Sequence, residues 1–260
     1  MFHFIVNGIA QQTEKNERIL TYLRETLRLT SVKNGCSEGA CGTCMILVDG
    51  KPTKSCVLTT ERAEGKNIVT VEGFSAREKD VYAYAFVSCG AVQCGFCTPG
   101  MLISAKGLLD VNQNPTREEA KLAIRNNICR CTGYKKIVDA ILLAATILRE
   151  NAPVPTVEFT GKVGENFYRV DAESKALGSA KYADDIKMPD MLYGSAVRSA
   201  YPRARIKAIH TEAAKALSGV ACVLTAAELP GAKIVGHLKQ DYNVLIGIGE
   251  ETHFLGDGIA

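Results

Sequence analysis

The chain has 260 residues, of which 47% are hydrophobic and 23% charged, and a formal net charge of +3. This composition excludes long-range disorder, and the small net charge without a long Lys/Arg run excludes an electrostatic nucleic-acid or membrane-surface footprint. No apolar stretch reaches the roughly 20 residues that a membrane-spanning helix needs. A chain of this length is expected to form two or three domains.

Residues 1–74 are expected to form a small α+β domain. The pattern of Phe2–Val6 predicts a strand that ends in a turn at Asn7-Gly8. Asn16 is placed to cap a helix, and the apolar positions of that helix fall on one face: Ile19, Leu20, Leu23 and Leu27.

The second half of this domain reads as a hairpin and a further strand. Met45 to Val48, the turn Asp49-Gly50 and the residues from Lys51 onward predict two antiparallel strands. Residues 68–71 predict another short strand. Between the helix and the hairpin lies a glycine-rich loop that carries three cysteines.

The first group of cysteines has the spacing C-x4-C-x2-C-x11-C and consists of Cys36, Cys41, Cys44 and Cys56. The first three follow the plant-type ferredoxin pattern, in which four thiolates hold a [2Fe–2S] cluster. Interleaved glycines allow main-chain N–H groups to approach an anionic cluster. A four-cysteine zinc site is the alternative, but such sites usually show paired C-x2-C knuckles.

Residues 80–150 change character and are expected to form four short amphipathic helices packed as a bundle. Thr98-Pro99 predicts a helix start with a hydroxyl cap and proline at the first position. Thr116 and Glu119 form a predicted capping box. A helix from about Tyr134 has apolar positions expected to face inward: Ile137, Ile141, Ala144, Ala145 and Leu148.

The second group of cysteines, Cys94, Cys97, Cys129 and Cys131, has the pattern C-x2-C…C-x-C. One pair directly precedes a predicted helix and the other lies between helices, and the free N–H groups of a helix start suit an anionic cluster. A C-x2-C pair alone also fits a dithiol redox pair or half of a zinc site. The closely spaced C-x-C pair favours metal ligation over a disulfide.

Two cysteines lie outside the two groups, and the cysteine content also bears on the cellular location of the protein. Cys89 and Cys222 lie in apolar stretches and are expected to be small core residues. The N-terminus lacks the features of a signal peptide, so ten cysteines are better explained by metal ligation in a reducing cytoplasm than by disulfides.

Residues 151–164 are expected to be a linker, because Pro153 and Pro155 oppose both helix and sheet. Beyond it, residues 165–260 mix strands and helices: residues 192–197, 206–210 and 220–224 are predicted strands, and residues 211–217 a short helix. The pattern stops in the middle of an alternation, so this third domain is expected to be incomplete.

Two stretches, KNGCSEGACGTC…SC and QCGFCTPG…CRCTGY, resemble the iron–sulfur portion of the molybdenum hydroxylases, the xanthine dehydrogenase and aldehyde oxidoreductase family. Residues 165–260 resemble the start of the molybdenum-binding portion, the α/β hammerhead region, through GSAKYADD at 178–185 and GVACVL at 219–224. The resemblance implies an α+β fold class: a β-grasp ferredoxin-like domain, a four-helix [2Fe–2S] domain, then the beginning of a hammerhead domain.

The same resemblance implies a direction for electrons. The helical-domain cluster would lie nearer a molybdopterin cofactor, with Gln93 and Cys131 as candidate contacts, and the ferredoxin-like cluster nearer the outlet. No flavin domain and no G-x-G-x-x-G motif occur in the chain, so FAD is expected on a separate subunit or replaced by another acceptor. The catalytic carboxylate of the family lies beyond position 260, so the chain is not expected to be catalytic alone.

The function predicted is therefore electron transfer in an oxidoreductase that oxidises a purine, N-heterocycle or aldehyde at molybdenum. The expected partners are the remainder of the molybdenum-binding subunit and an FAD-binding subunit, in an oligomer, without nucleic acid or membrane insertion. Two alternatives stay open: a stand-alone two-cluster carrier without a molybdenum role, and a zinc-stabilised interaction module. Residues 165–260 argue against the first, since a carrier does not need them.

Overall fold

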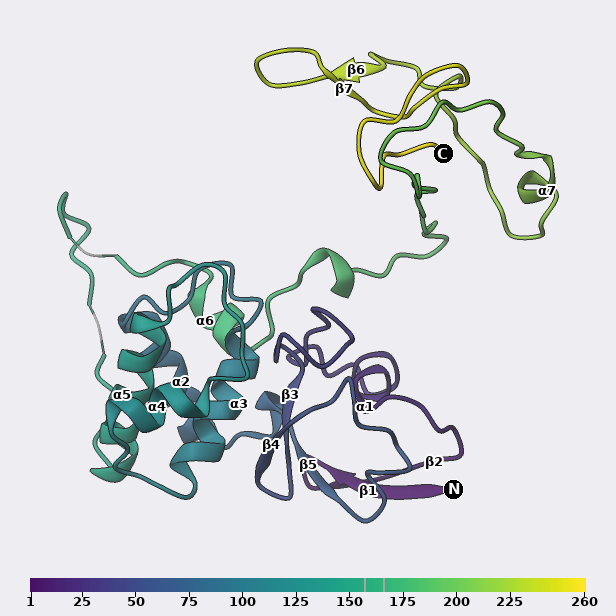
Figure 1. Cartoon of the computed structure of the whole chain (residues 1–260). Coiled ribbons are helices and arrows are strands. Elements are labelled where there is room, and N and C mark those ends of the chain that lie inside the picture. The colour runs from purple at the N-terminus through teal and green to yellow at the C-terminus, as the bar shows by residue number, and fades with distance from the viewer. Residues whose placement is uncertain (157, 166) are drawn as a thin grey trace. The chain divides into compact units, whose positions relative to one another are not determined.

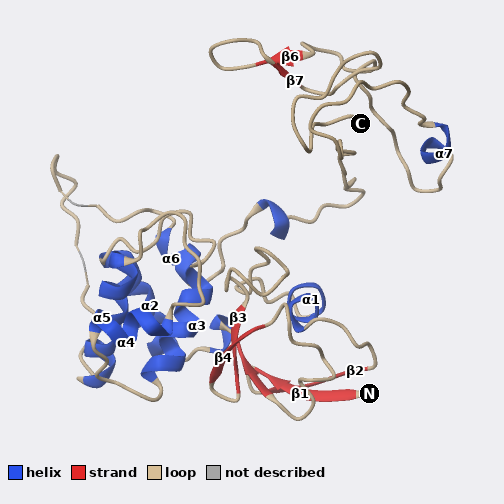
Figure 2. Ribbon diagram, viewed as in Figure 1, coloured by secondary structure: helices blue, strands red, loops and turns tan. Residues whose placement is uncertain are grey.

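The computed structural model describes residues 1–156, 158–165 and 167–260 (Figure 1). Contacts divide the chain into two compact units, Met1–Ile186 and Lys187–Ala260. The first unit contains a five-stranded sheet and a group of helices, whereas loops dominate the second (Figure 2). Among the described residues, no helix combines the length and the apolarity that crossing a membrane requires.

The sheet of the first unit is built from five short strands in the order β2-β1-β5-β3-β4. β1 and β5 are parallel and all other neighbours are antiparallel. One short helix and the π-helical turn η1 that follows it pack against the sheet, which gives the expected β-grasp arrangement. The bounds are β1 (Phe2–Val6), β2 (Ile9–Thr13), β3 (Met45–Val48), β4 (Lys51–Lys54), β5 (Asn67–Val69), α1 (Ile19–Thr21) and η1 (Tyr22–Thr26).

Both predicted turns, at Asn7-Gly8 and at Asp49-Gly50, are present, and each joins the two strands of a hairpin. Asn7 and Gly8 have φ angles of 50° and 81°, and Asp49 and Gly50 have φ angles of 48° and 78°. Two consecutive left-handed residues are what a two-residue hairpin turn requires. The predicted strand at residues 68–71 is shorter at its end, because the chain turns into a 3₁₀ helix, η2 (Val71–Gly73).

The prediction that Asn16 caps the first helix is wrong. The helix begins at Ile19 with Arg18 in the capping position and no side-chain cap. The N–H of Ile19 donates instead to the carbonyl of Leu58 at 2.8 Å, so a neighbouring loop satisfies it. The Asn16 amide donates to Glu61 at 3.1 Å.

Four helices follow the sheet, as predicted: α2 (Ala76–Ser88), α3 (Thr98–Leu109), α4 (Arg117–Ala123) and α5 (Lys135–Arg149). Ile137, Ile141, Ala144 and Ala145 of α5 are buried in their core and Leu148 is partly buried. The predicted hydroxyl cap at Thr98 is wrong, because Thr98 is already helical and Cys97 occupies the capping position without a side-chain bond. A further short helix, α6 (Ala172–Ala176), contributes Ala172 and Ala176 to the same core.

The predicted capping box at the start of α4 is confirmed. The Thr116 hydroxyl accepts from the N–H of Glu119 at 3.3 Å, and the Glu119 carboxylate accepts from the N–H of Thr116 at 2.7 Å. Thr116→Ala is expected to lower the free energy of unfolding by about 1 kcal/mol, because an N–H at the helix start loses its acceptor. Chemical denaturation measures the loss. Thr116→Ser keeps the hydroxyl and should restore most of the stability; equal losses in both variants would contradict the capping role.

Successive side chains of β3 are buried alternately in the core of the sheet and in the core of the helices. Ile46 is buried in the core between the sheet and α1, whereas Met45 and Leu47 are buried in the helical core. Successive strand residues point to opposite faces, so one strand serves both cores. Gly107 of α3 lies so close to Pro52 that a Cβ at this glycine would be 2.4 Å from the Pro52 ring.

The second unit does not contain the predicted strands at residues 192–197, 206–210 and 220–224. A strand forms only where neighbouring backbone takes up its hydrogen bonds. Within the described part of this unit, isolated bridges occur only beside these segments, at Arg198 with Gly258 and at Arg205 with Glu251, and Leu192 is 70% exposed. The unit has one small antiparallel pair, β6 (Ile234–Val235) with β7 (Tyr242–Asn243), and a short helix in the predicted region, α7 (Glu212–Lys215). A 3₁₀ turn, η3 (Ala183–Asp185), precedes the unit.

Candidate metal centres

The eight cysteines of the two predicted groups form four thiol–thiol contacts, and no contact crosses from one group to the other. A [2Fe–2S] cluster with four cysteine ligands places two thiolates on each iron, so pairwise contacts suit it. The contacting pairs are Cys36 with Cys41, Cys44 with Cys56, Cys97 with Cys129, and Cys94 with Cys131, whose sulfurs lie 3.5 Å apart. All ten cysteines are free thiols.

Each group has one inner pair and one outer pair. Cys44 and Cys56 are buried in the core that the sheet shares with α1, whereas Cys36 and Cys41 are partly exposed in the glycine-rich loop. In the helical domain, Cys97 and Cys129 are buried and the Cys94–Cys131 pair is exposed. Both groups thus present one sulfur pair toward the outside of the first unit.

The loop around Cys36 favours a thiolate. The N–H of Cys41 donates to Cys36 Sγ at 3.4 Å, and the N–H groups of Glu38 and Ala40 point to the same sulfur. These donors lower the pKa of the Cys36 thiol to about 7. Convergent main-chain N–H groups are typical of loops that hold an anionic group, and the predicted role of the interleaved glycines agrees with this.

The surroundings of the inner thiols favour the protonated form. Burial raises the pKa of Cys44 to about 11, and burial also raises the pKa of Cys97. Metal ligands of this type must be deprotonated, so metal binding at these positions would release protons that burial otherwise retains.

Hydroxyl groups at the second centre were not identified from the sequence. The Thr132 hydroxyl lies 3.1 Å from Cys129 Sγ, and the N–H of Cys129 donates to the Tyr134 hydroxyl at 2.9 Å. Burial works to raise the pKa of Cys129, but hydrogen bonds from Thr132 and the backbone bring it below its usual value. Tyr134 therefore contacts a candidate ligand directly, and its position five residues after Cys129 was the only signal.

The two cysteine loops are hydrogen-bonded to each other. The N–H of Ile128, which precedes Cys129, donates to the carbonyl of Cys41 at 2.8 Å. The buried Asn127 side chain donates to the carbonyl of Gly42 at 3.0 Å and accepts from the Ser104 hydroxyl at 2.7 Å. The hydrogen bond from Ile128 to Cys41 thus joins the two centres: Cys41 is a candidate ligand of the first, and Ile128 directly precedes Cys129, a candidate ligand of the second.

Among the residues that the structure describes, no three His, Cys, Asp or Glu side chains are grouped as ligands of a single metal ion. The donor set consists of thiols in pairs, which fits two-iron clusters. Gln93 is exposed beside Cys94, close to the exposed Cys131. Cys89 is partly buried against the helical core, as expected. The core placement of Cys222 is wrong: it is exposed, because the strand predicted around it does not form.

Three family models match the chain in succession. Residues 4–69 match a 2Fe-2S iron–sulfur cluster binding domain and residues 70–142 match a [2Fe-2S] binding domain. Residues 177–260 match the a/b hammerhead domain of aldehyde oxidase and xanthine dehydrogenase. The order agrees with the predicted fold.

Individual relatives agree with these matches. The aldehyde oxidoreductase of Megalodesulfovibrio gigas is 38% identical over 240 residues, which are 87% of this chain and 26% of that protein. The nicotinate dehydrogenase small FeS subunit of Eubacterium barkeri is 47% identical over 142 residues, which are 54% of this chain and 90% of that subunit.

Solved structures give the same result. The aldehyde oxidoreductase of Desulfovibrio gigas superposes with a TM-score of 0.87 at 34% identity, covering 100% of this chain and 31% of that one. The chain thus spans about a third or less of the aldehyde oxidoreductases, but nearly all of the small FeS subunit. It belongs to the molybdenum hydroxylase family of xanthine dehydrogenase and aldehyde oxidoreductase, as the two-[2Fe–2S] portion followed by the start of the molybdenum-binding portion.

Proposed function

We propose that this chain is the electron-transfer part of a molybdenum hydroxylase. When bound, two [2Fe–2S] clusters supply one-electron carriers between a molybdopterin centre, where a purine, N-heterocycle or aldehyde is oxidised, and flavin or another acceptor. The observation that carries this proposal is the arrangement of eight thiols in four contacting pairs, two in each [2Fe–2S]-binding domain.

Each residue group has a defined task in this proposal. The first cluster would be held by Cys36 and Cys41 in the loop and by the inner pair Cys44 and Cys56. Main-chain N–H groups of the loop would stabilise its negative charge. The domain ranges 1–74 and 80–150 stay predictions, as does the linker 151–164 before the incomplete domain 165–260.

The second cluster would be held by Cys97 and Cys129 on the inside and by Cys94 and Cys131 on the outside. We place the molybdopterin next to the exposed pair, with Gln93 and Cys131 as its contacts. Support comes from the exposure of these residues and from the hammerhead match, which follows the helical domain along the chain. The hydrogen bond from Ile128 to Cys41 would then link the two cluster loops.

The proposed partners are the remainder of the molybdenum-binding subunit and an FAD-binding subunit or another acceptor, within an oligomer. Relatives named as small subunits, such as that of the nicotinate dehydrogenase, support an assembly of several parts. A cytoplasmic location remains a prediction from the reduced state expected for ten cysteines. The hammerhead match over residues 177–260 favours this function over a stand-alone carrier.

Iron and acid-labile sulfide analysis tests the proposal. The loaded chain should contain about four iron atoms and about four sulfides, because two [2Fe–2S] clusters require them. Partial reduction should give two distinct electron paramagnetic resonance signals, since the two protein environments differ. Zinc without sulfide would overturn the cluster assignment in favour of an interaction module.

A further inference from the structure

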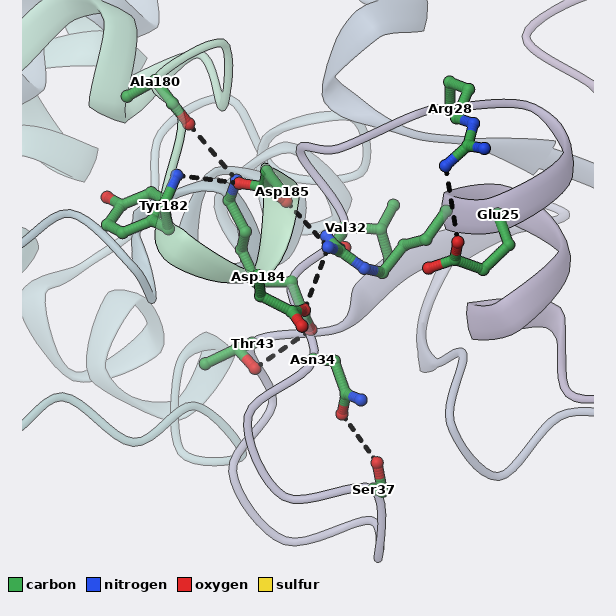
Figure 3. Close-up of polar contacts among 12 residues, drawn as sticks. Glu25, Arg28, Val32, Asn34, Ser37, Thr43, Ala180, Tyr182, Asp184 and Asp185 are labelled. Atoms are coloured by element: carbon green, nitrogen blue, oxygen red, sulfur yellow. Dashed lines mark hydrogen bonds and ion pairs between the residues drawn. The ribbon is translucent and has the colours of Figure 1, made fainter. Parts of the chain in front are cut away.

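A segment after the linker, residues 172–185, contacts both cysteine loops; we name it the clasp. Its second half belongs to the hammerhead match, which begins at residue 177, yet it lies within the first compact unit. The segment includes α6 and the turn η3, and its contacts with the ferredoxin-like domain are drawn in Figure 3.

One end of the clasp is held by buried charges. Asp185, with a side chain 2% exposed, accepts from Lys33 at 2.9 Å and from Arg24 at 2.7 Å. Lys33 is 1% exposed and Arg24 7%, so each cation depends on a carboxylate partner inside the protein. The neighbouring Asp184 also accepts from Arg24 at 3.1 Å (Figure 3).

Lys33 belongs to the first cysteine loop. Its carbonyl accepts from the Thr43 hydroxyl at 3.2 Å, and the same hydroxyl lies 3.2 Å from Cys41 Sγ. The Lys33–Asp185 ion pair is therefore connected to Cys41, a candidate ligand of the first cluster, through the Lys33 carbonyl and the Thr43 hydroxyl.

The clasp reaches the other centre through Tyr182, three residues before Asp185. Its hydroxyl donates to the carbonyl of Cys94 at 2.7 Å. Its ring packs edge-on against Phe96 at 5.2 Å, and the Lys33 ammonium lies 4.7 Å from the ring centroid. One tyrosine thus contacts the second cysteine loop and the lysine of the first.

Two glycines show how closely the clasp is packed. A Cβ on Gly178 would lie 2.4 Å from the Ser31 Cβ, and a Cβ on Gly95 would lie 2.5 Å from the Lys175 Cβ. The first contact is made with the ferredoxin-like domain and the second with the Cys94–Cys97 loop. A side chain at either glycine would therefore displace the clasp, from the ferredoxin-like domain at Gly178 or from the Cys94–Cys97 loop at Gly95.

We propose that the clasp locks the two cysteine loops together and sets the electrostatic environment of both clusters, with Tyr182, Asp185 and Lys33 as positioning residues. The inference rests on the proposed function, because it assumes a cluster in each loop. The reduction potential of a cluster follows nearby charge and hydrogen-bond donors. The clasp supplies the carboxylates that balance Lys33 and Arg24 near the first centre and a hydroxyl donor near the second.

Redox titration of the full chain, followed by electron paramagnetic resonance, tests the clasp. Asp185→Asn removes the buried negative charge beside Lys33 and Arg24, so it should raise the potential of the first cluster. Tyr182→Phe removes only the hydroxyl, so it should lower the potential of the second cluster and change its signal. General loosening of the fold would not shift the two potentials in opposite directions.

Tyr201→Phe, at an exposed tyrosine of the second unit, is the matched control and should leave both potentials unchanged. If Asp185→Asn fails to fold, Tyr182→Phe decides alone, because it keeps the ring and its packing. Wild-type potentials and signals in Tyr182→Phe would overturn the inference while leaving the clusters in place. Absence of both cluster signals from the loaded wild-type chain would instead overturn the proposed function.

Discussion

Gly42→Ala is expected to lower the free energy of unfolding by about 2 to 5 kcal/mol, because two costs combine at this position. Gly42 has a φ angle of 70°, where a side chain is strained. A Cβ there would also lie 2.1 Å from the carbonyl oxygen of Asn126 and 2.9 Å from the Cα of Asn127. These are backbone atoms of the second cysteine loop, so they cannot move aside as the end of a flexible side chain would.

The substitution should also disturb the link between the two loops. The carbonyl of Gly42 accepts from the Asn127 side chain, and the carbonyl of Cys41 accepts from Ile128. Pushing the loops apart lengthens both hydrogen bonds. Chemical denaturation measures the stability, and hydrogen exchange at the Ile128 amide should report the separation of the loops.

Gly50→Ala is the matched control. Gly50 has a similar φ angle of 78°, but no atom lies within 4 Å of the position its Cβ would take. It should therefore show only the backbone cost of about 1 to 2 kcal/mol. Equal destabilisation of the two variants would mean that contact between the loops adds nothing at Gly42.

Local signals predicted much of the first unit. The Asp49-Gly50 turn and the Thr116 capping box depend on neighbouring residues alone, and both occur where expected. The cysteine groups were also identifiable, since ligand spacing is a local property of the loop around Cys36 and of the C-x-C pair.

Contacts between distant segments could not be predicted in this way. Which thiol meets which depends on the fold, as in the contact between Cys94 and Cys131. Tyr182 contacts a cysteine loop 88 residues away, and nothing in its immediate sequence indicates this. The strand predicted at residues 192–197 failed for a related reason: apolar alternation favours a strand, but a pairing partner decides whether one forms.

Cys97→Ala is expected to abolish the second cluster and leave the first intact. Cys97 contacts Cys129 as the buried pair of its centre, so alanine leaves one iron with a single protein thiolate. Iron and sulfide should fall from about four to about two per chain, and one of two resonance signals should disappear. Cys44→Ala should remove the other signal, because Cys44 contacts Cys56 in the first centre.

Cys89→Ala separates ligand loss from the loss of a thiol in the helical core. Cys89 lies in the same domain, at the end of α2, where it packs against the helical core, and it is not one of the eight cysteines that form the thiol pairs. Its replacement should leave iron, sulfide and both signals unchanged. If Cys97→Ala kept all its iron, or if Cys89→Ala lost half of it, the division of the cysteines into two sets of four would be wrong. Selective loss of one signal from each ligand variant would establish two independent centres, because none of the four thiol pairs joins one set to the other.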